Sequence, residues 1–306
     1  MSRLFSTLPN SLRIGVLRGG PSPEYDASLK SGAHVLKQLY DTHIPLDIFI
    51  SKNGVWHLNG VEKSPEKILK HLDVVFNALH GMYGEDGRVQ EVLSNHGVKF
   101  VGSDRYSSSI AMNRQLAKEH LSPYGIKTPV HLVVRSSDNI VDRAHEIFNS
   151  IPHPLAIKPA KGGSAHGFAV AENFQDLYGI LNALLKNHDS VVVEEFIQGI
   201  PVSCLVTEDF RGESLYAFPP SNPLLLDETK SVEDMAKKVH NLLGLSHYSQ
   251  SDFMVSPRRG VYFLEVNTSP KFTEKSLAVR SLEKVGVGAK GFLHHVIGLA
   301  LNDKVR

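Results

Sequence analysis

The chain has 306 residues, enough for two or three domains of about 100–200 residues each, and 42% of them are hydrophobic, which suffices for packed cores. The 33 basic and 32 acidic residues leave a formal net charge of +1, which excludes the strongly basic surface typical of proteins that bind nucleic acids or membrane surfaces. The single cysteine, Cys204, excludes an intrachain disulfide, and without an apolar run of about 20 residues or an apolar N-terminal signal we expect a cytoplasmic protein.

The first hundred residues alternate β-rich runs with helical patterns. Strands are predicted at residues 13–17, 46–50, 74–78 and 98–101. Apolar residues recur at helical spacing in residues 27–40, between the first two strands. This β-α-β order predicts an open parallel α/β sheet.

A helix at residues 107–121 leads into two further groups of elements. In the first group, strands are predicted at 131–134, 155–158, 168–171 and 191–195, and helices at 142–149 and 173–187. In the second group, strands are predicted at 202–206, 215–218, 250–255 and 261–266, and helices at 232–243, 274–284 and 287–301. We place domain boundaries near 103 and 195, which gives domains 1–103, 104–195 and 196–306.

The segment from Asp252 to Asn267 predicts a β-hairpin with oxygen ligands on one face. A turn centred between Arg258 and Arg259 would place Asp252 opposite Glu265, with Asn267 on the same face. Such oxygen atoms suit Mg²⁺. The alternative is an amphipathic hairpin with its polar face in water. The predicted faces carry Phe253, Val255, Leu264 and Val266 on the core side, and Met254 and Phe263 beside the carboxylates, which speaks against that alternative.

A glycine-rich loop with two lysines follows the strand that delivers Lys158. Its residues 158–167 include Lys161, Gly163 and Ser164. Such a loop can direct several backbone N–H groups at a phosphate while the lysines supply charge. The alternative is a flexible hairpin loop with surface lysines.

Two loops in the first domain also lie at strand ends, where open α/β sheets commonly bind ligands. Glu24 follows a Gly-Gly pair and could hold a substrate ammonium group, or could simply be a charge at a helix N-terminus. His80 begins a glycine-rich loop and is a weaker candidate. Glu85 and Asp86 are interpreted as the start of the following helix.

Five motifs together resemble the D-alanine–D-alanine ligases of the ATP-grasp superfamily. The matching segments are residues 19–24, 80–87, 102–103, 158–167 and 264–273. The resemblance implies a three-domain ATP-grasp fold with ATP held between the central and C-terminal domains. It implies synthesis of D-Ala-D-Ala through a D-alanyl phosphate, for peptidoglycan precursors, and suggests a homodimer.

The resemblance also implies roles in donor and nucleotide binding. Glu24 would hold the ammonium group of the first D-alanine, near His80. Lys158 and Arg114 would contact the ATP phosphates, which the loop around Ser164 would cover. The other residues implied in nucleotide binding are Lys161, Gly163, Glu194, Phe196 and Ile197, with Glu194 reading the adenine amino group.

The C-terminal motifs carry the metal and the second substrate in the same resemblance. Asp252, Glu265 and Asn267 would bind two Mg²⁺ ions, for which Mn²⁺ could substitute. Ser276 and Leu277 would orient the carboxylate of the second D-alanine.

Several positions depart from the family pattern. Gln250 stands where the family has an oxyanion-stabilising Arg, and Lys271 replaces a Gly, so we hypothesise that Lys271 restores the missing charge. Pro201 replaces the Glu expected at the ribose, a contact that Glu195 could take over. Residues 218–229 are too short for the family's lid with its Tyr-x-x-Lys-Tyr core. Two alternatives therefore stay open: a ligase for another amino acid or a hydroxy acid, and a catalytically weak ATP-binding homologue.

Overall fold

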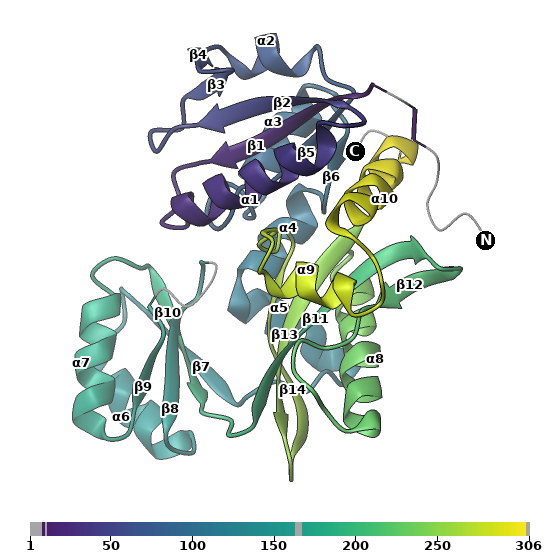
Figure 1. Ribbon diagram of the computed structural model, residues 1–306. Helices are drawn as coiled ribbons and strands as arrows, with labels where there is room; N and C mark the ends of the chain where they lie inside the picture. Colours follow the sequence, from purple (N-terminus) through teal and green to yellow (C-terminus); the bar gives the residue numbers. More distant parts are fainter. Residues whose placement is uncertain (1–7, 10, 163–166, 304–306) are drawn as a thin grey trace.

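The computed structural model describes residues 8–9, 11–162 and 167–303, and its strands form three separate sheets (Figure 1). None of the helices in these residues is long and apolar enough to cross a membrane. The three sheets fall within the three predicted domains, whose exact boundaries remain a prediction.

The first sheet has six strands in the order β4-β3-β2-β1-β5-β6. Strand β1 (Arg13–Gly19) pairs in parallel with β2 (Ile44–Ile50) and β5 (Val74–Asn77), and β5 pairs in parallel with β6 (Phe100–Val101). This is the predicted parallel sheet. The short antiparallel strands β3 (Trp56–Leu58) and β4 (Val61–Glu62) extend one edge and were not predicted.

Helices cover both faces of this sheet. On one face, α1 (Tyr25–Leu39) and the C-terminal α10 (Ala289–Asn302) share an apolar core with β1 and β5, so the end of the chain returns to the first domain (Figure 1). On the other face, α2 (Pro65–Leu69) and α3 (Arg88–Asn95) bury their apolar residues. The loops with Glu24 and His80 follow the carboxyl ends of β1 and β5, where Ser269 Oγ donates to the Asn77 carbonyl oxygen at 2.9 Å.

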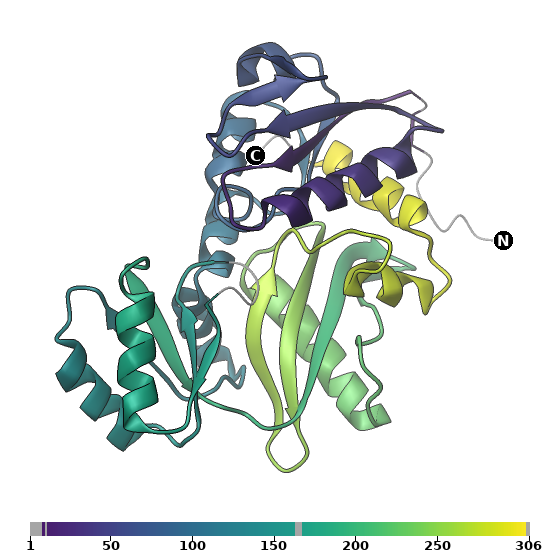
Figure 2. The same cartoon turned by 60° about the vertical axis from the view of Figure 1, so that its left-hand side comes forward.

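The second sheet is antiparallel, in the order β7-β10-β8-β9. Its strands are β7 (His131–Arg135), β8 (Leu155–Pro159), β9 (Ala169–Ala171) and β10 (Ser190–Glu195). Helices α6 (Ile140–Ser150) and α7 (Phe174–Leu184) pack side by side against it, away from the third sheet (Figure 2).

The third sheet is also antiparallel, in the order β12-β11-β13-β14. Its strands are β11 (Ile200–Phe210), β12 (Glu213–Ala217), β13 (Tyr248–Ser256) and β14 (Gly260–Asn267). Helix α8 (Leu226–Leu242) covers one face through an apolar core, and the short α9 (Leu277–Glu283) follows β14. The face away from α8 is turned toward the second sheet.

The single helix predicted at residues 107–121 is wrong, because two helices, α4 (Arg105–Met112) and α5 (Arg114–Leu121), occupy it. Asn113 interrupts them with extended backbone (φ −96°, ψ 105°), and its side chain accepts hydrogen bonds from Gln115 N and Leu116 N. Asn is a favoured helix N-cap for this reason. A 3₁₀ turn, η1 (Ser122–Tyr124), ends α5.

Candidate active site

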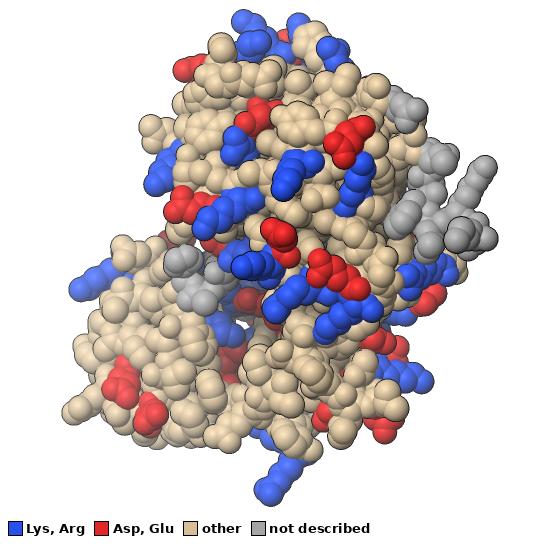
Figure 3. All heavy atoms as spheres, in the orientation of Figure 1, with Lys and Arg blue, Asp and Glu red and all other residues tan. Residues whose placement is uncertain are grey.

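Two adjoining cavities lie where the three sheets meet. The first, of ≈ 320 Å³, is lined by Glu24, His80, Glu85, Gln250, Asp252, Glu265, Asn267, Ser269, Pro270, Lys271, Thr273, Lys275, Ser276 and Leu277. The second, of ≈ 430 Å³, is lined among others by Arg114, Lys158, Phe168, Pro201, Met254 and Leu264. Asp252, Glu265 and Leu277 line both cavities. Figure 3 shows acidic and basic side chains gathered around this meeting point.

The β13–β14 hairpin places the predicted metal ligands on the wall between the cavities. Asp252 pairs with Glu265, as predicted, and Asn267 is two residues further along β14. The pairing arises differently from the expectation, since a β-bulge shifts the register between Asp252 and Phe253. Leu264 is the extra residue of the bulge: it lies on β14 between Phe263 and Glu265 and has no partner on β13.

The bulge reverses two predicted side-chain directions. Phe263 was placed beside the carboxylates, but it is 1% exposed and packs on Phe253 in the core under α8. Leu264 was assigned to the core, but it lines the second cavity. Met254 remains an apolar neighbour of the carboxylates, as expected, and Leu264 joins it in the second cavity.

The electrostatics of Asp252 indicate a site for a cation. Burial, followed by the charge of Glu265, raises the pKa of Asp252 to about 7, while hydrogen bonds from Ser203 and Gln250 lower it. Two facing carboxylates with an amide oxygen nearby form a hard-oxygen set, which fits Mg²⁺. The described residues contain no group of three His, Cys, Asp or Glu side chains that could hold a metal.

Arg114 on α5 joins the hairpin to the second sheet. Its Nε and Nη2 lie 2.8 and 2.6 Å from Glu265 Oε2, and its Nη1 donates to the carbonyl oxygen of Pro159 at 2.9 Å. The side chain is 5% exposed. Its guanidinium therefore supplies a fixed positive charge at the second cavity, paired with a carboxylate that lines both cavities.

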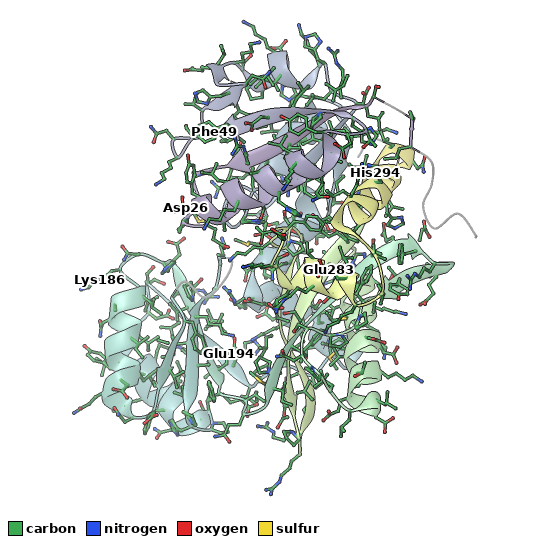
Figure 4. The ribbon with its side chains drawn as sticks, in the orientation of Figure 1. Asp26, Phe49, Lys186, Glu194, Glu283 and His294 are labelled. Atoms are coloured by element: carbon green, nitrogen blue, oxygen red, sulfur yellow. The ribbon has the colours of Figure 1, made fainter. Side chains whose placement is uncertain are left out.

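A buried ion pair, which the sequence did not suggest, lies behind Lys158. Lys118 Nζ is 2.6 Å from Glu194 Oε1, with side-chain exposures of 0% and 1%, and Lys158 Nζ is 3.9 Å from the same oxygen. Burial would raise the pKa of Glu194, but the charges of Lys118 and Lys158 hold it below its usual value. Figure 4 shows Glu194 at the side of the second sheet that faces the third. The position of Lys118, one helical turn after Arg114, was the available signal.

Glu24 presents a carboxylate oxygen without a partner to the first cavity. Lys271 Nζ lies 3.4 Å from Glu24 Oε2, whereas Glu24 Oε1 is buried and accepts no hydrogen bond among the described residues. Gly81 makes room for this side chain, because a Cβ there would lie 2.4 Å from Ser22 Oγ and 3.3 Å from Glu24 Oε1. An unpartnered buried acceptor indicates a ligand with N–H donors.

His80 and Glu85 fix the loop that forms the floor of this cavity. His80 Nδ1 donates to the Ser269 carbonyl oxygen at 2.9 Å, so Nε2 accepts from the Ser31 hydroxyl at 2.8 Å. Glu85 precedes α3 rather than beginning it, and its two oxygens accept from Gly81 N and Ser269 N. Burial raises the pKa of Glu85 to about 8. Glu85 thus belongs to the cavity, which sequence reasoning missed.

Some predicted residues are not brought to these cavities. Glu195 accepts from Arg259 at 2.8 and 3.1 Å and is not among the residues that line the second cavity, so the structure does not bring it there with Pro201. Lys161 forms an isolated bridge with Asn113 and lines a smaller hollow nearby. Phe196 and Ile197 follow β10, outside the residues that line the two cavities. Gly163 and Ser164 lie outside the described residues.

Comparisons with known proteins point to one family. Residues 59–103 match the family model described as the D-ala D-ala ligase N-terminus, and residues 121–222 and 220–298 match the D-ala D-ala ligase C-terminus. The D-alanine–D-alanine ligase of Geobacter sulfurreducens is 31% identical, over 93% of each chain.

Solved structures share the whole fold. The D-alanine-D-alanine ligase of Coxiella burnetii has a TM-score of 0.86 at 23% identity and covers 96% of this chain and 95% of its own. The VanG D-Ala:D-Ser ligase of Enterococcus faecalis has a TM-score of 0.84 at 25% identity, covering 95% and 99%. The expected fold class, a three-domain ATP-grasp arrangement with an N-terminal parallel α/β sheet, is confirmed.

Proposed function

The chain belongs to the D-alanine–D-alanine ligase family, and from this we propose that it joins two D-alanines in an ATP-dependent reaction. The donor carboxylate attacks the γ-phosphorus of ATP and yields D-alanyl phosphate and ADP. The amine of the acceptor then attacks the carbonyl carbon, phosphate leaves, and D-Ala-D-Ala forms for peptidoglycan precursors. One observation supports this best: the Asp252–Glu265 pair lines both the cavity that holds Glu24 and the cavity that holds Lys158 and Arg114.

The donor subsite is assigned to the first cavity. Glu24 Oε1 would accept from the donor ammonium group, since it is the buried oxygen without a partner. Lys271 would approach the donor carboxylate from the side of Glu24 and supply the charge that Gln250 lacks. His80 would shape the subsite through its two fixed hydrogen bonds rather than donate to substrate.

The nucleotide is assigned to the second cavity. Lys158 and Arg114 would neutralise phosphate charge, because they are the basic residues that line it. The resemblance assigns Glu194 to the adenine amino group and Phe196 and Ile197 to the side of the ring, although none of the three is among the residues that line this cavity. Lys161 and the loop with Gly163 and Ser164 would cover the phosphates.

Mg²⁺ would be held by Asp252, Glu265 and Asn267, as two ions that Mn²⁺ could replace. When bound, the metal shields the phosphate oxygens from the approaching carboxylate. Arg114 already neutralises Glu265, and it would keep that carboxylate aligned beside the nucleotide.

The acceptor is assigned to the wall formed by Ser276 and Leu277. Ser276 caps α9, and its Oγ donates to the Thr273 carbonyl oxygen at 2.8 Å. Leu277 is 37% exposed and borders both cavities, so it can exclude water from the acyl phosphate. A homodimer is carried over from the resemblance alone.

A second candidate, a ligase for another acceptor, is favoured by a specific observation. VanG is a D-Ala:D-Ser ligase with the same fold, and the departures at Gln250 and Lys271 both line the substrate cavity. A catalytically weak ATP-binding homologue is the third reading, since Gln250 carries no charge.

An assay of ADP formation with and without D-alanine, with mass detection of the product, tests the proposal. D-alanine-dependent ADP and D-Ala-D-Ala are expected, and D252N should abolish both while leaving the chain folded. D-serine and D-lactate are added as competing acceptors. Preferential incorporation of either one over D-alanine would favour the second candidate. ATP binding without any amino-acid-dependent ADP formation would refute a ligase function.

A further inference from the structure

Lys275 differs from the other cations at the two cavities because it has no acidic partner. Glu24 is paired with Lys271, and Glu265 is paired with Arg114. Lys275 lines the first cavity and is exposed, yet within the described parts of the chain no carboxylate lies within 4 Å of its Nζ and no hydrogen bond occupies it. The first cavity thus presents one positive charge that no described side chain neutralises.

The chemistry of the reaction leaves one anion that requires such a charge. The donor carboxylate becomes an acyl phosphate, but the acceptor keeps its carboxylate from binding to product release. Ser276 and Leu277, the proposed acceptor wall, directly follow Lys275 in the chain and line the same cavity.

Ser276 by itself cannot supply a hydroxyl donor to that carboxylate. Its Oγ already donates to the Thr273 carbonyl oxygen at 2.8 Å and accepts from Val279 N at 3.4 Å. A hydroxyl has a single proton to donate. The first backbone N–H groups of α9 can also donate to that carboxylate, but they carry no full charge, whereas Lys275 offers three N–H groups and a full positive charge.

We propose that Lys275 determines acceptor specificity by binding the acceptor carboxylate, so that the enzyme takes amino acids with a free carboxylate and rejects their amides and esters. The inference rests on the proposed ligase function. It adds no chemical step, because the acceptor amine still attacks the acyl phosphate carbonyl carbon and releases phosphate.

Competition between two acceptors tests the inference. The enzyme receives ATP, Mg²⁺ and equal concentrations of D-alanine and D-alaninamide, and mass spectrometry measures the ratio of D-Ala-D-Ala to its amide. Both amines compete for the same acyl phosphate, so the ratio reports the acceptor step alone. In K275M the ratio should fall about tenfold relative to wild type, the change that about 1.4 kcal/mol produces. The charge-preserving K275R should stay within about threefold of wild type.

Two lysines serve as matched controls. Lys271 lines the same cavity but is paired with Glu24, so K271M should lower total product and leave the ratio unchanged. Lys186 lies at the far edge of the second domain, and K186M should change neither (Figure 4).

The outcomes separate the inference from the function on which it rests. If K275M forms D-Ala-D-Ala and its amide in the wild-type ratio, Lys275 does not bind the acceptor carboxylate, and the ligase function is unaffected by that result. If the wild-type enzyme forms neither product, the ligase function fails and the inference fails with it. Since Lys275 is exposed and makes no described hydrogen bond, K275M should retain the wild-type melting temperature.

Discussion

Arg114 and Glu265, 151 residues apart in the chain, are joined by two N–H groups that converge on the single oxygen Oε2. The pair ties α5, in the predicted domain 104–195, to the hairpin that carries the proposed metal ligands in the predicted domain 196–306. It keeps one of two facing carboxylates neutralised, while burial and the charge of Glu265 raise the pKa of the other, Asp252. The Arg114 guanidinium therefore compensates part of the negative charge of the Asp252–Glu265 pair.

We predict that R114Q makes folding stability dependent on a divalent cation. Without Arg114, Glu265 stays in the cavity opposite Asp252 with no cation, which should cost about 2 kcal/mol because Glu265 is only partly exposed. Thermal melting with and without millimolar Mn²⁺ measures this, and Mn²⁺ should recover part of the loss. In the control R105Q, which breaks the exposed pair with Glu91, Mn²⁺ should change nothing. Equal recovery in both variants would contradict the interpretation.

K118M should be among the more destabilising single changes in the chain. Lys118 and Glu194 are fully buried, so removing the ammonium leaves a buried carboxylate with only Lys158 at 3.9 Å. Loss of one partner of a buried pair costs about 3–5 kcal/mol. Urea unfolding measures this, and the double variant K118M/E194Q should recover part of it. The exposed pair Lys237–Glu213 is the control, because K237M should cost less than about 1 kcal/mol.

The sequence could predict the strands of the site because each carries its own local signal. The β-branched runs of β1, β5 and β10 and the alternation along β13 and β14 hold in the structure, with ends shifted by at most two residues. Asp252 opposite Glu265 followed from the period of a hairpin. The bulge at Leu264 did not, because a bulge is set by packing on both sheet faces rather than by a local pattern.

Contacts between distant segments explain the other failures. Asn113 breaks the predicted helix because it caps α5 and bridges to Lys161, 48 residues further along the chain. The local pattern predicts Glu85 at the start of a helix, yet its hydrogen-bond partner Ser269 N is 184 residues away in the chain. The residues next to Asn113 and Glu85 in the chain do not indicate the contacts with Lys161 and Ser269. The roles of the five motifs could be predicted because the family resemblance assigned them.

The reversed directions of Phe263 and Leu264 give a direct test of the bulge. F263A should destabilise the protein by about 3–5 kcal/mol, since Phe263 is 1% exposed and packs on Phe253. L264A should cost much less stability and should weaken nucleotide binding instead, because Leu264 lines the second cavity. Urea unfolding and ATP titration on both variants measure the two effects. If L264A lost more stability than F263A and F263A weakened ATP binding instead, the hairpin would have the regular register, without a bulge.

His80 should make stability fall in mild acid. Its Nδ1–H donates to the Ser269 carbonyl oxygen and its Nε2 accepts from Ser31, so the folded state holds the neutral ring. Burial, helped by the charge of Lys271, lowers the pKa of His80 to about 4, whereas the unfolded chain has about 6.5. Below pH 6.5 the His80 ring is therefore protonated in the unfolded state but stays neutral in the folded state. The free energy of unfolding falls as the pH decreases toward 4. In urea unfolding, the stability advantage of wild type over H80N should shrink by about 2 kcal/mol between pH 7 and pH 5. The same comparison for H71N, at an exposed histidine, should show no such change, and a constant gap for H80N would mean that the folded state binds the proton as readily as the unfolded chain.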